Sequence, residues 1–293
     1  MSKRGFLLFL SSSVIGGLPW WFTKILLEEF SPSGIVLIRA GGAGFVMLLY
    51  SLHQKTLLIA LKKWHWIIVF ALIQMTIPWW LTSYAQQGID SSVVGLLMAT
   101  IPIFALLFAF IEGERSAISG SRIIGVITGL IGVSLLIGID AAIGKSDIVK
   151  ILLVILCTMG FAYGPRLVRR HLSGVPTTGV LTIAMIFTAI TWCVPAISSW
   201  PKESLGNKYI LAAIAISLLC TVAGFIIYLE AIKEIGPQNT ALLSFTNPIV
   251  SICVGVLFAN ESLSLGIMAG FPVIMLGIYL SISKRANTQT LPI

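Results

Sequence analysis

The sequence predicts an all-α integral membrane protein in which ten transmembrane helices form two inverted five-helix repeats. Composition, the spacing of apolar segments and an internal similarity all support this fold class. Of the 293 residues, 57% are hydrophobic and only 10% are charged, whereas a soluble domain carries about 25% charged residues. Because a soluble protein needs a polar surface wherever it meets water, this composition is typical of a surface that faces lipid.

The apolar segments have the length of membrane spans. A helix needs about 20 mostly apolar residues to cross a bilayer. The first segment is too long for a signal peptide and lacks a small-residue cleavage site, so we expect it to remain as a span. We expect helices over residues 6–27, 33–52, 65–84, 91–110, 120–138, 148–167, 178–198, 208–229, 238–258 and 264–282.

The lysines and arginines predict the orientation of the chain. With the N-terminus in the cytoplasm, thirteen of them fall in inner loops and tails and only four in outer loops. Basic residues are retained on the cytoplasmic side, so both termini are expected there. The inner residues are Lys3, Arg4, Lys55, Lys62, Lys63, Arg115, Arg122, Arg166, Arg169, Arg170, Lys233, Lys284 and Arg285. The outer residues are Lys145, Lys150, Lys202 and Lys208.

Two halves of the chain resemble each other. Residues 85–102 align without a gap with residues 231–248, which places Pro102 over Pro248. Because each unit holds five helices, an odd number, the second copy must enter the membrane from the opposite side. Such inverted repeats are typical of secondary transporters. The expected units are residues 1–140, residues 146–283 and a polar cytoplasmic tail over residues 284–293.

These features carry a family resemblance over residues 5–283. Arg39 stands early in the second helix, the two prolines recur in helices 4 and 9, and Gly113-Glu114-Arg115 follows helix 4 while its second copy keeps only Glu261. In this the chain resembles the ten-helix, EamA-type bacterial branch of the drug/metabolite transporter superfamily. The resemblance implies alternating access around a central cavity in the bacterial inner membrane, and often export of amino acids or related metabolites.

Helix 9 carries a polar stripe that predicts a substrate contact. Thr240, Ser244, Asn247 and Ser251 follow at spacings of 4, 3 and 4, which places them on one helical face. Asn247 lies about 14 Å into the helix, and Pro248 frees a backbone carbonyl there. Hydrogen bonding to a neighbouring helix is the alternative explanation.

Two tryptophan pairs stand in the outer third of the membrane. Trp20 and Trp21 follow Pro19, and Trp79 and Trp80 follow Pro78. Adjacent residues point about 100° apart on a helix, so one ring of each pair is expected to face inward. Inward rings suit an aromatic or amine-bearing solute, whereas outward rings would belong to an interfacial belt.

Two cations lie within predicted spans. Charges inside a membrane are costly and mark functional candidates. The Arg39 guanidinium is a candidate to bind a substrate carboxylate through two N–H groups. The alternative for both cations is snorkelling to the outer surface. Lys24 could also be neutralised by Glu28, one turn further along the helix. No acidic residue lies at mid-depth, so a buried proton relay is not evident.

Other residues suggest mechanical roles or none. Pro19, Pro78, Pro102 and Pro248 are candidate hinges. Glycines four apart begin helices 5 and 10 and predict a close helix contact, either within one chain or in a homodimer. The four cysteines lack paired spacing, so no metal or cofactor is expected. The net charge of +8 is spread over short loops, which excludes a nucleic-acid partner.

Taken together, these residues predict a secondary transporter for a small metabolite, an amino acid (possibly aromatic) or an amine-type solute, that exports it by alternating access. A channel is the closest rival, but rings of charge or carbonyl-rich filter sequences are absent. The sequence shows no signalling domain, which argues against a receptor. The predicted spans carry no paired catalytic residues, so we expect no enzymatic activity.

Overall fold

The computed structural model describes residues 2–113, 120–142 and 147–282. Every regular element in these ranges is a helix. Eight helical segments are long and apolar enough to cross a membrane, and two shorter apolar helices, Leu243–Phe258 and Leu265–Leu280, complete the set. The predicted all-α membrane fold with ten helices is therefore confirmed. The expected tail over residues 284–293 lies outside the described residues.

Several spans consist of more than one helix. The first span combines α1 (Lys3–Gly17) and α2 (Pro19–Leu26), and the second is α3 (Pro32–His53), followed by the short α4 (Leu57–Leu61). The remaining elements of the first half are α5 (Trp64–Ala71), the π-helix η1 (Leu72–Thr76), α6 (Ile77–Ala85), α7 (Ser91–Met98), α8 (Ile101–Ile111) and α9 (Gly120–Ala142). The second half holds α10 (Ile148–His171), α11 (Thr177–Ser198), α12 (Asn207–Ile214), the π-helix η3 (Ala215–Ala223), α13 (Gly224–Thr240), α14 (Leu243–Phe258) and α15 (Leu265–Ile282).

The two π-helices occupy corresponding places in the two halves. Residue 85 aligns with residue 231, an offset of 146, so residues 72–76 of η1 correspond to residues 218–222. That range lies inside η3. Since π-helical turns are rare and frequent at functional sites, their repetition extends the similarity of the halves to an irregular feature of the third helix in each.

Corresponding helices of the two halves run antiparallel and in contact. Three contacts join α3 and α11 in opposite sequence order. Ser31 bonds Ser199 at one end of the pair, Thr182 donates to the Met47 carbonyl, and Thr56 bonds Thr178 near the other end. In α7 and α14, Gly95 lies against Ser251 and Ser92 against Gly255. Antiparallel equivalents are the geometry that an inverted repeat requires.

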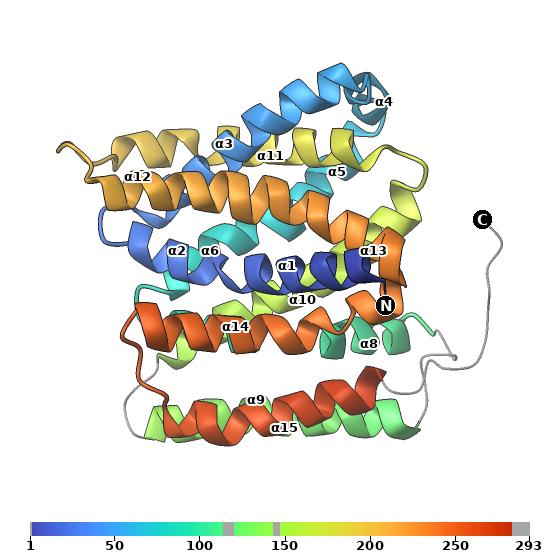
Figure 1. Ribbon diagram of the computed structural model, residues 1–293, viewed down its shortest axis with the longest axis vertical. Helices are drawn as coiled ribbons and strands as arrows, with labels where there is room; N and C mark the ends of the chain where they lie inside the picture. Colours follow the sequence, from blue (N-terminus) through green and yellow to red (C-terminus); the bar gives the residue numbers. More distant parts are fainter. Residues whose placement is uncertain (1, 114–119, 143–146, 283–293) are drawn as a thin grey trace.

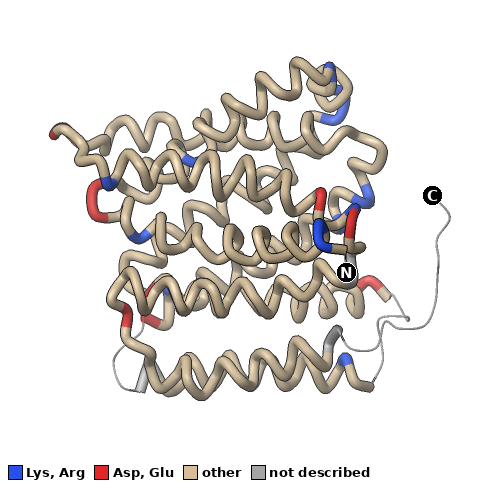
Figure 2. Tube along the Cα trace, in the orientation of Figure 1, with Lys and Arg blue, Asp and Glu red and all other residues tan. Residues whose placement is uncertain are grey.

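The helices form a layered bundle (Figure 1). The α3–α11 pair lies along one edge and the α9–α15 pair along the other, with the remaining spans between them. Charged residues gather at the two ends of the bundle, as Figure 2 shows. Helix α1 begins at the end of the bundle where α15 finishes, as expected for an even number of spans.

Glycines hold α9 and α15 together. A Cβ on Gly277 would press on the backbone of Gly129, and one on Gly132 would press on the backbone of Ile274. Small residues allow such close helix contact in membranes. The glycine-rich helices that motivated the expected homodimer therefore already pack on each other within one chain, and the homodimer itself stays an untested prediction.

Gly277→Ala should destabilise the protein by about 1–3 kcal/mol, because the added methyl group meets backbone atoms that can move only with their helix. Gly138→Ala on α9 is the matched control, since nothing lies within 4 Å of its added Cβ. Thermal unfolding of the two variants in detergent measures the difference. Equal stability would show that the α9–α15 contact adapts freely.

Candidate functional site

Arg39 is held between three spans. Its guanidinium lies over the Trp79 ring of α6, with 4.1 Å from Cζ to the ring centroid. Its Nε donates to the Thr221 hydroxyl of η3 at 3.0 Å. Arg39 stands seven residues beyond the first residue of α3, about 10 Å into the helix. The π-helix η3 and Trp79 together hold a cation inside the membrane span.

Arg39 has no acidic partner among the described residues. Its recorded contacts are the Thr221 hydroxyl and the Trp79 ring, and it forms none of the ion pairs. A guanidinium has five N–H donors, and one of them is used here. The other four donors could bind an anion, and the carboxylate fork expected from the sequence stays a prediction.

Trp80, the neighbour of Trp79, belongs to a separate aromatic stack. Its ring lies parallel to Trp192 of α11 at 5.2 Å and to Tyr84 at 5.3 Å. The Trp192 indole N–H donates to the Thr76 carbonyl, 2.9 Å away, at the end of η1. The stack therefore ties α6 to α11 and satisfies a backbone oxygen of the π-helix.

The first tryptophan pair divides as the 100° rule predicts. Trp21 packs its ring 4.9 Å from Phe22 and 5.4 Å from Phe258, and it lines a groove. Trp20 instead lies against Gly95 and packs on an apolar core to which α7, α9, α10 and α15 contribute. Among the ring contacts of the described residues, none joins Trp21 or Trp20 to the second pair, so the two pairs do not form one stacking surface here.

The polar stripe expected on helix 9 is not one continuous helical face. Helix α14 begins at Leu243, and Thr240 precedes the break, where its hydroxyl donates to the Gly236 carbonyl. Ser251 donates to the Ser91 carbonyl of α7, and Ser244 is half-buried near the start of α14. The helix predicted over residues 238–258 is interrupted at residues 241–242, where hydrogen bonds from Leu242 N to Asn239 O and from Ser244 N to Ala241 O replace the α-helical pattern by tighter turns.

Asn247 is the member of that stripe with unused hydrogen-bonding capacity. It faces α1, where a Cβ on Gly16 would lie 2.6 Å from its Nδ2. Its Oδ1 is buried and has no hydrogen-bond partner. A buried polar atom without a partner costs about 1–3 kcal/mol, so Asn247 keeps its place as a candidate contact for a solute.

Three of the four candidate hinge prolines stand at helix breaks. Pro19 begins α2, Pro78 follows η1, and Pro102 lies in the first turn of α8. Pro248 differs because it lies inside the continuous helix α14. The corresponding prolines 102 and 248 therefore produce a break in one half and none in the other.

Lys24 joins two loops at one end of the bundle, which we call the Lys24 end. Its ammonium lies 2.8 Å from Asp90 Oδ1 and 3.0 Å from Glu261 Oε1. The neutralisation by Glu28 considered from the sequence is not what the structure shows, since Glu28 pairs with Lys208 of α12 at 2.8 Å. Lys24, Asp90 and Glu261 form an ionic clamp between the two repeats.

Glu261 also caps helix α7. Its carboxylate accepts hydrogen bonds from Ser91 N at 2.8 Å, Ser91 Oγ at 2.7 Å and Ser92 N at 2.9 Å. Asp90 holds the N-cap position of this helix, yet its side chain makes no cap bond, because it turns to Lys24 instead. A carboxylate at a helix N-terminus is also stabilised by the helix dipole. Sequence reasoning placed both carboxylates in loops and missed this contact.

The clamp gives folding stability a defined pH dependence. Burial alone would raise the pKa of Glu261, but hydrogen bonds from Ser91, Ser92 and Lys24 bring it below its ordinary value of 4.5. The folded state then binds fewer protons than the unfolded chain, so this stabilisation is present above pH 4.5 and is lost as the pH falls through the lowered pKa.

We therefore expect the wild-type melting temperature in detergent to fall between about pH 6 and about pH 3. Glu261→Gln should melt lower than wild type at pH 6 and lose less over this range, because it has no charge to neutralise. Parallel pH curves for the two proteins would contradict the role given to Glu261.

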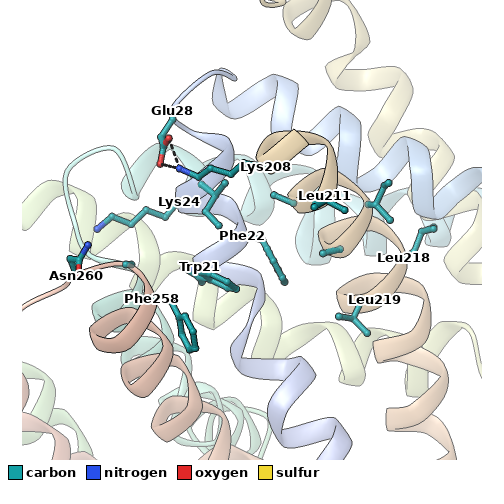
Figure 3. A pocket seen from close by; sticks show the side chains of 15 residues that line it. Trp21, Phe22, Lys24, Glu28, Lys208, Leu211, Leu218, Leu219, Phe258 and Asn260 are labelled. Atoms are coloured by element: carbon teal, nitrogen blue, oxygen red, sulfur yellow. Dashed lines mark hydrogen bonds and ion pairs between the residues drawn. The ribbon is translucent and has the colours of Figure 1, made fainter. Parts of the chain in front are cut away.

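A groove of about 830 Å³ opens beside the clamp, between α2, α12, η3 and the end of α14. Figure 3 shows Trp21, Phe22, Phe258 and leucines along it, with the Glu28–Lys208 pair near one end. Lys24 stretches along its wall toward Asn260. Apolar walls with a few charged groups at one end suit an amphipathic solute. A second cavity, of about 370 Å³, is also lined by Lys24.

Comparison with known proteins agrees with these features. The EamA-like transporter family matches residues 3–138 and again residues 148–283. The chain belongs to the EamA-like transporter family. The transporter YvbV of Bacillus subtilis is 23% identical over 286 residues, 94% of this chain and 90% of its own. The inner membrane transporter YedA of Escherichia coli K12 is 22% identical over 263 residues, 86% of this chain and 81% of its own. Both are described as uncharacterized.

A solved structure shares the EamA fold of this chain. It superimposes with a TM-score of 0.65 at 16% sequence identity, over 97% of this chain and all of the other. At that identity the match shows the fold alone. Family and relatives together indicate a multi-pass membrane transporter, and they leave its substrate to be inferred from the site.

Proposed function

We propose that this EamA-family protein exports a small amino acid, with an apolar or aromatic side chain, across the inner membrane by alternating access. Both termini lie in the cytoplasm in this proposal, so the Lys24 end faces outward. The observation that carries the substrate class is Arg39, a guanidinium without an acidic partner inside the spans.

Charge selects among the solutes considered from the sequence. A purely cationic amine would meet the positive charge of Arg39, with no carboxylate recorded among its contacts to offset the repulsion. An amino acid instead brings a carboxylate, which a guanidinium binds through a two-pronged, charge-assisted contact. The arrangement therefore favours an amino acid over an amine-type solute.

Aromatic surface supports the choice of side chain. The groove at the Lys24 end is walled by Trp21, Phe22 and Phe258. Aromatic pairs add about 0.5–1.5 kcal/mol beyond their buried area. Asn247, with its unpartnered Oδ1 at the contact of α1 and α14, can accept a hydrogen bond from the solute ammonium.

The architecture of the two halves supports alternating access. Corresponding helices run antiparallel, and the third helix of each half contains a π-helix. Two similar halves can exchange conformations and so open one site to either side in turn. Helix breaks at Pro19, Pro78 and Pro102 provide places where spans can bend.

Counterflow in liposomes tests this function. Purified protein is reconstituted, the vesicles are loaded with unlabelled L-phenylalanine, and uptake of labelled L-phenylalanine is followed. A carrier shows saturable uptake that internal substrate accelerates, and agmatine inside should not substitute. Flux without acceleration would indicate a channel, and acceleration by agmatine alone would indicate an amine transporter. A C-terminal reporter active only outside the cytoplasm would overturn the orientation.

A further inference from the structure

The second cavity, of about 370 Å³, contains groups that the proposed transport site at Arg39 does not use. It lies among the end of α6, the 86–90 loop and the start of α15. Its walls include Lys24, Gln86, Asp90, Ser262 and Ser264. Lys24 lines both this cavity and the groove, so the two spaces adjoin the same ammonium group.

Gln86 shows that this region has unused hydrogen-bonding capacity. The residue lines the cavity and is only 5% exposed, yet neither its Nε2 nor its Oε1 has a hydrogen-bond partner. Buried side-chain amides are nearly always bonded. Both atoms are closed to solvent in this conformation, so a ligand in the cavity meets them once the Gln86 side chain turns toward it, and the amide then offers a donor and an acceptor together.

The charges at the cavity are also only partly used. An ammonium group has three N–H donors, and Lys24 directs two of them to Asp90 and Glu261. Asp90 accepts through Oδ1, while its Oδ2 has no recorded partner and its side chain is 43% exposed. One donor of the cation and one oxygen of the anion therefore stay open, side by side.

Other nearby charges leave the cavity close to neutral. Lys150 places its ammonium against Gly88, a lining residue, and pairs with Asp147 at 3.6 Å. Glu261, behind Lys24, is committed to the cap of α7. The five charges, Lys24 and Lys150 against Asp90, Asp147 and Glu261, sum to one negative charge. A surface with one open cationic and one open anionic contact is complementary to a zwitterion rather than to a simple anion or cation.

We propose that this cavity is a second binding site for the solute, specific for zwitterions of the α-amino acid type. The solute carboxylate binds the free donor of Lys24, and the solute ammonium binds the free oxygen of Asp90, while Gln86 bonds both groups. This proposal rests on the proposed function, because it takes the transported amino acid as the ligand. At the outward end, the site would hold the solute as it leaves the membrane.

The test separates this site from the one at Arg39 by working in the Arg39→Gln background. Binding of L-phenylalanine to the purified full-length protein is measured by calorimetry and compared with two single-charge analogues. N-acetyl-L-phenylalanine keeps only the carboxylate, and L-phenylalaninamide keeps only the ammonium. We expect the amino acid to bind and each analogue to bind about tenfold more weakly.

Variants then locate the binding. Asp90→Asn should weaken L-phenylalanine binding about tenfold, and so should Ser262→Phe, which fills the cavity from an exposed loop position. Lys233→Met, which removes a cation at the opposite end, is the control and should bind normally. Melting curves verify that each variant is folded.

Three results would overturn the proposal. Binding of both analogues as tightly as L-phenylalanine would show that the cavity does not distinguish a zwitterion, and loss of all binding in the Arg39→Gln background would leave Arg39 as the single site. Unchanged binding in Ser262→Phe would place the ligand elsewhere. Failure of the proposed function is distinguishable, because counterflow would then be absent while L-phenylalanine still binds the Arg39→Gln protein.

Discussion

Arg39→Gln should reduce amino-acid counterflow by about 10- to 100-fold while the amount of folded protein stays near the wild-type level. The expected loss corresponds to one charge-assisted contact, about 1.5–3 kcal/mol. Glutamine can still donate to the Thr221 hydroxyl, so the contact that packs the side chain against η3 is retained. Flux per reconstituted protein, measured over a range of substrate concentrations, gives the effect.

Arg39→Lys is the informative companion. Lysine keeps the charge but lacks the planar fork and stacks less well on Trp79, so we expect activity between wild type and Arg39→Gln. If Arg39 serves only to join α3 to η3, activity in both variants should instead fall in proportion to the folded fraction. Normal transport by Arg39→Gln would remove the main argument for a carboxylate-bearing substrate.

Glu261→Ala should destabilise the protein by about 3–5 kcal/mol, because it removes a buried carboxylate that accepts three hydrogen bonds, each worth about 1.5–3 kcal/mol to a charged group. The Glu261 side chain is 1% exposed, and without it the N–H groups of Ser91 and Ser92 lose their acceptor. Chemical or thermal unfolding in detergent at neutral pH should show a clear drop in stability.

Glu28→Gln is the matched control at the same end of the bundle. Glu28 also pairs with a lysine at 2.8 Å, but its side chain is 49% exposed. Exposed ion pairs contribute at most about 1 kcal/mol, so this variant should melt close to wild type. If both variants lose the same stability, burial does not increase the contribution of Glu261 to the free energy of unfolding.

The sequence determined the fold of this protein almost entirely. Apolar segments of membrane length reveal the spans directly, because a segment that crosses lipid must be apolar over its whole length and must form its backbone hydrogen bonds within its own helix. The alignment of residues 85–102 with residues 231–248 revealed the inverted repeat, and the antiparallel pairs α9–α15 and α3–α11 bear it out. Arg39 was likewise recognisable, since a charge within a span is conspicuous in any sequence.

Tertiary structure alone decided which polar groups meet. Lys24 and Glu261 are 237 residues apart, and the local pattern pointed to Glu28, which is only one turn away. Asp90 precedes α7 as an ordinary cap would, yet Glu261 from another loop performs the capping. Packing also decided which contact each of these tryptophan rings makes. Trp79 lies under Arg39, Trp80 stacks on Trp192, and Trp21 lines the groove. Hydropathy reports whether each residue prefers lipid or water, whereas these contacts depend on how helices that are distant in the sequence are placed around each other.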